Sequence, residues 1–213
     1  MSDFVLYVGT KRYSSWSLRP YLALAATGAR FRTEVIALDR PETKRDILAV
    51  NPAGKVPALR HGDLLIHDSL AICEYVHELF PDARLWPADR AERARARAIT
   101  AEMHSGFVAL RSNMPMDLLA SKPGVGHTPE VLADAARIFD IWRAARAVAR
   151  GGDFLFGHFT IADAFFAPVA TRFTTYGVAL DAVCRAYVDA VQALPALQAW
   201  KADAAHEAPL PSH

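Results

Sequence analysis

The sequence predicts an α/β domain followed by an all-α domain. Segments rich in β-forming residues occur only within the first 80 residues, and capped segments with helical periodicity fill the chain from residue 89 onward. Between them, residues 81–88 carry two prolines and no periodicity, which is typical of a linker. A chain of 213 residues is long enough for two small domains, so we predict one at residues 1–80 and one at residues 89–213.

The first predicted elements are a strand, a helix and a second strand. Residues 4–8 are rich in β-formers. Apolar residues then repeat at helical spacing over residues 18–26, with Gly28 just beyond the end and Pro20 in the first turn, where proline is tolerated. Residues 31–38 alternate in polarity, so the three segments form a βαβ unit with a parallel crossover.

A short helix over residues 41–50 and a β-hairpin are predicted next. The hairpin has apolar runs at residues 56–59 and 64–66 with a Gly-Asp turn between them. Pro57 at its start removes a donor from the strand ladder. The main-chain N–H and C=O of Val56 are therefore free to pair with something else, such as a peptide.

Asp68 and Ser69 come directly before a helical stripe of apolar residues, so they occupy the N-cap region of that helix. Unused N–H groups and the positive end of the helix dipole can hold a carboxylate there. With this helix, the first 80 residues have the order βαβ-α-ββα, which is the order of the thioredoxin fold. We therefore predict a thioredoxin-like domain.

Helices fill the predicted second domain. Asp89 and Glu92 resemble a capping box that opens a long helix, which we expect to reach Leu110. Thr160 and Asp163 form a second capping box. The other predicted helices begin at Pro129 or cover residues 183–194 and 196–204.

Composition argues against several classes of protein. The net charge is +1, and 52% hydrophobic with 22% charged residues is typical of a globular chain, so we expect no nucleic-acid partner. We also expect a cytoplasmic protein without membrane contact, because no secretory signal is visible and no apolar run approaches the ~20 residues that span a bilayer. Cys73 and Cys184 are far apart and the eight histidines are scattered, which indicates neither a disulfide nor a metal site.

The sequence Val-Pro-Ala-Leu at residues 56–59, followed by an acidic residue and serine that open a helix, resembles the glutathione site of the cytosolic glutathione S-transferases. A Ser/Thr-x-x-Asp box like the one at Thr160 also stands in the helical domain of that family. The resemblance implies that Pro57 is cis and that the Val56 main chain pairs with the cysteinyl part of glutathione.

The same resemblance implies that Asp68 and Ser69 hold the γ-glutamyl end of glutathione. Lys55 would reach the glycyl carboxylate, although a solvated lysine is an alternative. From the residues alone, Pro57 could also be an edge-strand proline, and Asp68 with Ser69 could be only a helix cap.

Glutathione reacts as its thiolate, because a thiol with a pKa near ~8.5 is mostly protonated at neutral pH. The segment Ser14-Ser-Trp-Ser-Leu-Arg19 is similar to the zeta-class loop, which reads Ser-Ser-Cys-Ser, an aromatic residue and arginine. The similarity implies that Ser14 stabilises the thiolate, with Ser15 close by and Tyr13 as an alternative hydroxyl. The serines could also simply cap the helix. Trp16 stands where the zeta class has cysteine. This difference favours glutathione binding over maleylacetoacetate isomerase activity as the prediction. We expect Arg19 to form an ion pair with an acidic neighbour, since it opposes the helix dipole, and an approach to the site is the alternative.

The second substrate is expected near Phe107, Arg111, Met114 and Met116, an irregular run whose methionines suit an adaptable apolar pocket. This run resembles one in an uncharacterised bacterial subgroup of the family. The resemblance implies a serine-type glutathione transferase, a homodimer active in detoxification, that attacks a small electrophile with glutathione and needs no metal. A zeta-like cis-trans isomerase and a non-catalytic glutathione-binding protein are the alternatives.

Overall fold

The computed structural model describes residues 4–207. Its one sheet contains β1 (Phe4–Gly9), β2 (Phe31–Ile36), β3 (Ala58–His61) and β4 (Leu64–His67), in the order β2-β1-β3-β4. β1 and β2 are parallel, whereas β3 is antiparallel to both of its neighbours. The helices of this half are α1 (Ser15–Ala26), α2 (Thr43–Val50) and α3 (Ser69–Leu79). The predicted βαβ-α-ββα order of a thioredoxin-like domain is therefore confirmed.

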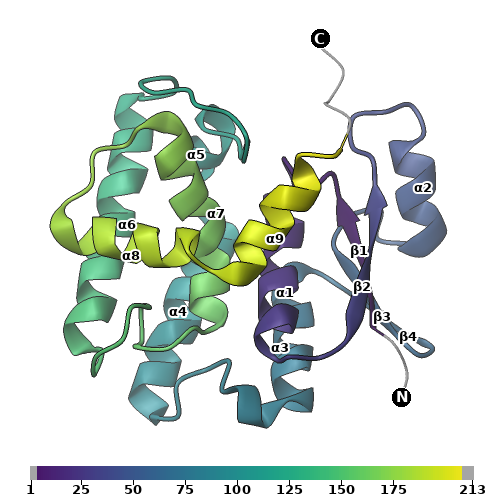
Figure 1. Cartoon of the computed structure of the whole chain (residues 1–213), viewed down its shortest axis with the longest axis horizontal. Coiled ribbons are helices and arrows are strands. Elements are labelled where there is room, and N and C mark those ends of the chain that lie inside the picture. Colours follow the sequence, from purple (N-terminus) through teal and green to yellow (C-terminus); the bar gives the residue numbers. More distant parts are fainter. Residues whose placement is uncertain (1–3, 208–213) are drawn as a thin grey trace.

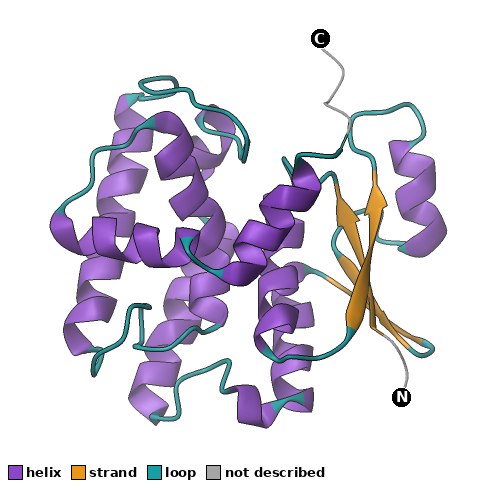
Figure 2. Cartoon of the chain, viewed as in Figure 1, coloured by secondary structure: helices purple, strands orange, loops and turns teal. Residues whose placement is uncertain are grey.

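The remaining helices form the second half of the molecule. A 3-10 turn, η1 (Pro81–Ala83), precedes them, and among residues 4–207 no further strand follows β4 (Figure 2). The predicted all-α half is thus confirmed. Its helices are α4 (Arg90–Ser105), α5 (Val108–Asn113), α6 (Pro129–Val148), α7 (Ile161–Tyr176), α8 (Ala182–Gln192) and α9 (Pro195–Ala204).

One face of the sheet is turned toward the helical half. α1 and α3 lie between the sheet and that half, and α2 lies on the opposite side of the sheet (Figure 1). Residues of β1, α1 and α3 belong to the same apolar cluster as residues of α4, α6 and α7. The start of α1 is consequently held between the two halves.

α7 is the central helix of the second half, and almost every residue of it is buried. Its start is fixed by Asp163, which accepts hydrogen bonds from the N–H and hydroxyl of Thr160 and from the N–H of Leu155. The predicted capping box is confirmed. Burial raises the pKa of Asp163 to about 6 although these hydrogen bonds favour the ionised form.

Two predicted helix boundaries are wrong. The long helix does not continue to Leu110, because it ends before Gly106 and Phe107 adopts φ 59° in the left-handed region. A side chain at Gly106 would come within 2.8 Å of the Glu102 carbonyl oxygen, so the residue type is required by the turn. α1 begins at Ser15, so Pro20 lies inside the helix rather than in its first turn.

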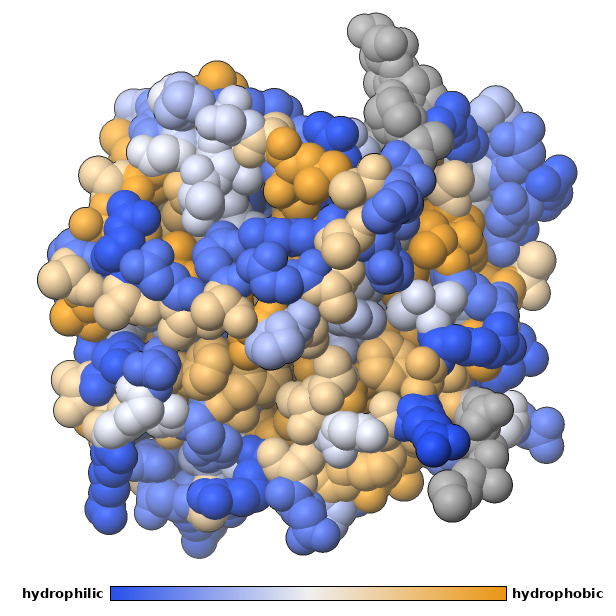
Figure 3. Space-filling view, in the orientation of Figure 1, coloured by the Kyte–Doolittle hydropathy of each residue, from blue (hydrophilic) through white to orange (hydrophobic). Residues whose placement is uncertain are grey.

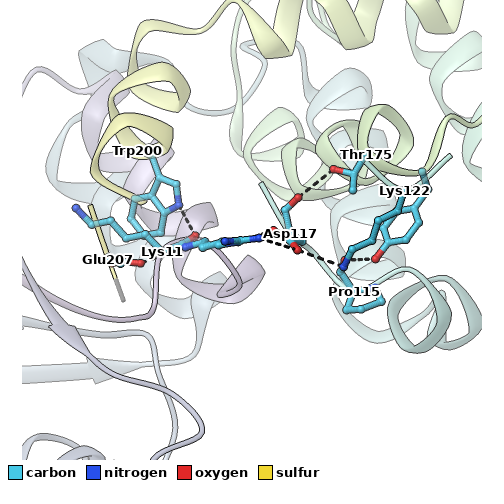
Figure 4. Close-up of polar contacts among 9 residues, drawn as sticks. Lys11, Pro115, Asp117, Lys122, Thr175, Trp200 and Glu207 are labelled. Atoms are coloured by element: carbon cyan, nitrogen blue, oxygen red, sulfur yellow. Dashed lines mark hydrogen bonds and ion pairs between the residues drawn. The ribbon is translucent and has the colours of Figure 1, made fainter. Parts of the chain in front are cut away.

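A polar network joins the loop before α1 to the helical half (Figure 4). Asp117 receives hydrogen bonds from the Arg12 guanidinium, at 2.6 and 3.2 Å, and forms an ion pair with Lys122 at 3.2 Å. The indole N–H of Trp200 on α9 donates to the Lys11 carbonyl oxygen at 2.9 Å. Loop and helices are therefore tied at several points.

Among residues 4–207, no helix has the length and apolarity needed to cross a bilayer. Charged and apolar residues are mixed over the face shown in Figure 3, with apolar residues gathered toward its middle.

Candidate functional site

A cavity of about 740 Å³ lies where the start of α1, the segment before β3, the β4–α3 junction and the end of α4 meet. This volume is within the range of small-molecule sites. It is lined by Trp16, Ile47, Ala53, Gly54, Lys55, Val56, Pro57, His67, Asp68, Ser69 and His104. All five residues that the sequence assigned to ligand binding before and after the hairpin are therefore in one cavity.

The segment before β3 presents an unpaired main chain to this cavity. The Val56–Pro57 peptide bond is cis, as the resemblance implied. Among residues 4–207, neither the N–H nor the C=O of Val56 has a hydrogen-bond partner. Asn51, which is fully buried, fixes the segment by donating to the Lys55 carbonyl oxygen at 2.7 Å and accepting from the Ala53 N–H at 3.0 Å.

The β4–α3 junction carries a charged capping residue next to a hydroxyl without a hydrogen-bond partner among the described residues. Asp68 adopts φ 73°, a region that costs a non-glycine residue of the order of 1–3 kcal/mol. In this conformation its Oδ1 caps α3 by accepting from the N–H groups of Leu70 (2.8 Å) and Ala71 (3.3 Å). Next to it, the buried hydroxyl of Ser69 has no hydrogen-bond partner among the described residues. A free hydroxyl at a helix N-terminus can bind an anion.

His104 on α4 completes this corner and was missed by the sequence analysis. Its Nε2 lies 3.2 Å from Asp68 Oδ2, and its ring meets Trp16 edge-on with centroids 5.3 Å apart. Burial lowers the pKa of His104, and Arg19 and Arg111 lower it further, whereas Asp68 opposes the shift. Nothing in the spacing of residues 68 and 104 could have revealed this contact, because it depends on how α4 packs against α3.

The serines of the predicted catalytic loop lie beside the cavity but do not line it. Ser14 is the N-cap of α1, and its hydroxyl donates to Ser17 Oγ at 2.8 Å. Ser15 Oγ accepts from an Arg172 guanidinium nitrogen at 3.3 Å. Both serines are only 6% exposed, and the half-buried Tyr13 does not line the cavity either.

Two positively charged guanidinium groups lie close to the Trp16 ring. The Cζ atoms of Arg19 and Arg111 lie 4.2 and 4.8 Å from its ring centroid, and Arg19 also lies 4.6 Å from the Phe165 ring. Arg19 is completely buried, and none of its three side-chain nitrogens has a hydrogen-bond partner among the described residues. The predicted ion pair of Arg19 is therefore wrong, and aromatic faces take the place of a carboxylate.

The run predicted to bind a second substrate lies mainly in the core. Phe107, Met114 and Met116 are 8, 0 and 2% exposed, and none of them lines the cavity. Arg111 does not line the cavity either; its guanidinium lies against the Trp16 ring and donates to the Gly106 carbonyl oxygen at 2.9 Å and to the Met103 carbonyl oxygen. The predicted run therefore reaches the site only through the contact of Arg111 with Trp16. No group of three or more metal-ligating side chains occurs within residues 4–207.

Both halves of the chain match models of known protein families. Residues 13–79 match the family model described as glutathione S-transferase, N-terminal domain, and residues 91–200 match glutathione S-transferase, C-terminal domain.

Individual relatives carry isomerase names. A probable maleylacetoacetate isomerase of Caenorhabditis elegans is 36% identical over 118 residues, so this chain spans about half the length of that relative (55% of this chain, 54% of the other). The maleylacetoacetate isomerase of Pseudomonas aeruginosa is 31% identical over 83% of this chain and 84% of its own. A holo structure of maleylpyruvate isomerase, a bacterial zeta-class protein, has a TM-score of 0.71 at 25% identity, covering 92% of this chain and 95% of its own.

Proposed function

Because the chain belongs to the glutathione S-transferase family, we propose that it binds glutathione in the 740 Å³ cavity and uses the glutathione thiolate to attack a small electrophile. The observation that carries this proposal is the unpaired main chain of Val56 next to the Asp68–Ser69 corner. An extended peptide would complete the hydrogen bonds of Val56 as an added strand does. Its charged end would then reach the start of α3.

The roles of the binding residues follow from their chemistry. Asp68 Oδ2 would accept from the α-ammonium of the γ-glutamyl group, and the Ser69 hydroxyl would donate to the adjacent carboxylate. Lys55 is exposed at the other end of the segment, where it would pair with the glycyl carboxylate. The proposed assembly is a cytoplasmic homodimer, with residues 1–80 and 89–213 as its two domains.

For the thiolate, the hydrogen bonds favour Ser15 over Ser14. The Ser14 hydroxyl proton is directed to Ser17, whereas Ser15 accepts from Arg172 and keeps its own proton available. Ser15 is also the first residue of α1, where the helix dipole favours a negative charge. We therefore propose Ser15 as the donor to the thiolate and Ser14 as the residue that fixes the loop.

Binding is tested by titrating glutathione into the wild-type protein and an Asp68→Asn variant by calorimetry. Asparagine caps a helix as well as aspartate does, so α3 stays formed while the charge is lost. We expect affinity to fall about ten-fold, the lower end for a hydrogen bond to a charged group, because the Asp68 side chain is 45% exposed. Asp63→Asn, in the exposed hairpin turn, is the matched control. Equal affinities for the wild type and Asp68→Asn would contradict the proposed binding mode.

The thiolate is tested by following its ultraviolet absorbance against pH in the glutathione complex. Ser15→Ala should raise the pKa of the bound thiol more than Ser14→Ala does. A larger shift in Ser14→Ala would reverse the two roles. Turnover of a generic aryl halide in the same variants reports the transfer reaction, and binding without turnover of any electrophile would support a non-catalytic protein.

A glutathione-dependent cis-trans isomerase is the second candidate, since two relatives that cover this chain widely carry isomerase names. Trp16 stands where the zeta-class loop has cysteine, and it occupies the cavity wall. Conversion of maleylacetoacetate by the wild type would establish the isomerase. Conversion by Trp16→Cys alone would show that Trp16 excludes this substrate.

A further inference from the structure

A second cavity, of about 240 Å³, lies beside the linker that runs from α3 to α4 (Figure 1). It is at the opposite end of α3 from Ser69 and shares no lining residue with the 740 Å³ cavity. Its ionisable lining residues are three arginines and a histidine, namely Arg84, Arg93, Arg97 and His77, and no carboxylate lines it. The glutathione chemistry proposed above gives this cavity no role.

Two of the guanidinium groups are oriented by hydrogen bonds. Arg93 Nη1 donates to the carbonyl oxygens of Pro87 and Ala88 at 3.1 and 2.8 Å. Arg97 Nη2 donates to Glu74 Oε2 at 3.3 Å. The remaining nitrogens of both groups have no partner among the described residues, so each can still donate to a ligand. Side chains that are already ordered lose less conformational entropy when a ligand binds.

Arg84 and His77 add donors without a partner. The Arg84 guanidinium is exposed and makes no hydrogen bond or ion pair within residues 4–207. The Arg84 main chain turns with φ 51°, and His158 Nε2 donates to its carbonyl oxygen at 2.9 Å. His77 Nδ1 is buried and also lacks a partner in the described part of the chain. A buried polar atom without a partner costs free energy, which a ligand can recover.

Carboxylates flank the lining residues in the chain but do not line the cavity. Glu78, Asp82 and Asp89 each follow a lining residue directly, and Glu74 is the ion-pair partner of Arg97. A nucleic acid or an anionic membrane, which spreads its charge over a wide surface, would meet these carboxylates and be repelled. A small anion can enter the cavity and contact the guanidiniums. The charge pattern therefore favours a small ligand.

We propose that this cavity binds the phosphate group of a small phosphorylated molecule, independently of glutathione. A planar guanidinium pairs with two phosphate oxygens at once, and a doubly charged group can use more than one arginine. A neighbouring cavity of about 460 Å³ also includes Arg84 and carries charges of both signs, as on Arg150 and Glu92. The rest of the ligand has room there, where its hydroxyl groups would pair with these side chains.

Three probes test the ligand class by calorimetric titration into the whole protein without glutathione. Ribose 5-phosphate has both the phosphate and hydroxyl groups, inorganic phosphate has only the former, and ribose has only the latter. We expect ribose 5-phosphate to bind at least as tightly as inorganic phosphate, and ribose to give no binding heat. Vesicles of phosphatidate carry the same phosphate group on a lipid and should bind no better than neutral vesicles.

Variants then assign the binding to the cavity. Arg84→Gln removes the charge of a side chain that has no partner in the described chain, so the fold should be kept. Affinity for ribose 5-phosphate should fall about ten-fold or more, the range for hydrogen bonds to charged groups. Arg185→Gln is the matched control, because Arg185 is exposed on α8, lines neither cavity and likewise has no partner among the described residues. Its affinity should equal that of the wild type.

The outcomes that overturn the proposal are distinct from those that concern glutathione. No binding of ribose 5-phosphate by the wild type, or an equal affinity in Arg84→Gln, would refute the site. An equal fall in Arg84→Gln and Arg185→Gln would show a response to net charge alone, and binding of phosphatidate vesicles without binding of ribose 5-phosphate would refute a small ligand. Glutathione affinity should be the same in the wild type and Arg84→Gln whichever result is found.

Discussion

Replacing Asp117 by asparagine should destabilise the protein by about 1.5–2 kcal/mol, a value at the lower end for hydrogen bonds to charged groups. The carboxylate is 6% exposed and receives two hydrogen bonds from Arg12 and an ion pair from Lys122. The lower end applies because the Arg12 and Lys122 side chains are 27 and 43% exposed, so water can replace part of the interaction. For a chain of this size the loss corresponds to about 3–8 °C in Tm.

The same variant has a defined pH dependence. Burial alone would raise the pKa of Asp117, but hydrogen bonds from Arg12 and Lys122 outweigh it and hold the pKa below its ordinary value. A depressed pKa in the folded state contributes stability above the unfolded pKa of about 3.9, and this contribution disappears as the pH falls through the folded pKa. The difference between the wild type and Asp117→Asn should therefore shrink below about pH 4.

Urea unfolding followed by tryptophan fluorescence at pH 7 and pH 3 measures both effects. Asp140→Asn is the matched control, because Asp140 pairs with Arg143 through a side chain that is 67% exposed, and its loss should cost less than about 0.5 kcal/mol. An Asp117→Asn difference of the same size at both pH values would refute the electrostatic account of this network.

Two further predictions concern stability. Gly152→Ala should lower the free energy of unfolding several times more than Gly151→Ala, which should lower it by about 1–2 kcal/mol. A side chain at Gly152 would lie 1.9 Å from the Gly157 carbonyl oxygen, whereas one at Gly151 meets open space. Equal melting temperatures of the two variants would contradict this prediction. The pKa of Asp163 in the folded state is about 6. Its protonated carboxyl therefore contributes to the free energy of unfolding below the pKa of the unfolded state, and this contribution is lost as the pH rises to 6. The unfolding free energy of Asp163→Asn, measured by urea titration, should thus gain on that of the wild type from pH 4 to pH 7, and a constant difference would argue against a raised pKa.

The starts of helices could be predicted from the sequence where a local chemical signature marks them. Thr128 and Thr160 cap the helices expected after them, because a side-chain cap involves residues only two or three positions apart. The end of α4 could not be predicted in the same way. Apolar spacing continues through Phe107 to Leu110, so the spacing contains no sign of the left-handed conformation of Phe107 that separates α4 from α5.

In the candidate site, too, local features could be predicted from the sequence and contacts between distant elements could not. Asp68 and Ser69 could be found because they form one cap, and Val56 because it precedes Pro57. Trp16 and His104 meet only after α4 is placed against α1 and α3, and no sequence spacing encodes that contact. The expected ion pair of Arg19 failed because aromatic rings supply the contacts that a carboxylate was expected to provide, one from Trp16 in the same helix and one from Phe165 on the distant α7.

The contact between Trp200 and Lys11 has a consequence for biosynthesis. The loop leading to the serines is held by α9, whose Trp200 lies 189 residues further along the chain, so a growing polypeptide reaches its final geometry at this loop only after α9 has been translated. The loop before α1 therefore waits for a distant helix before its geometry is complete.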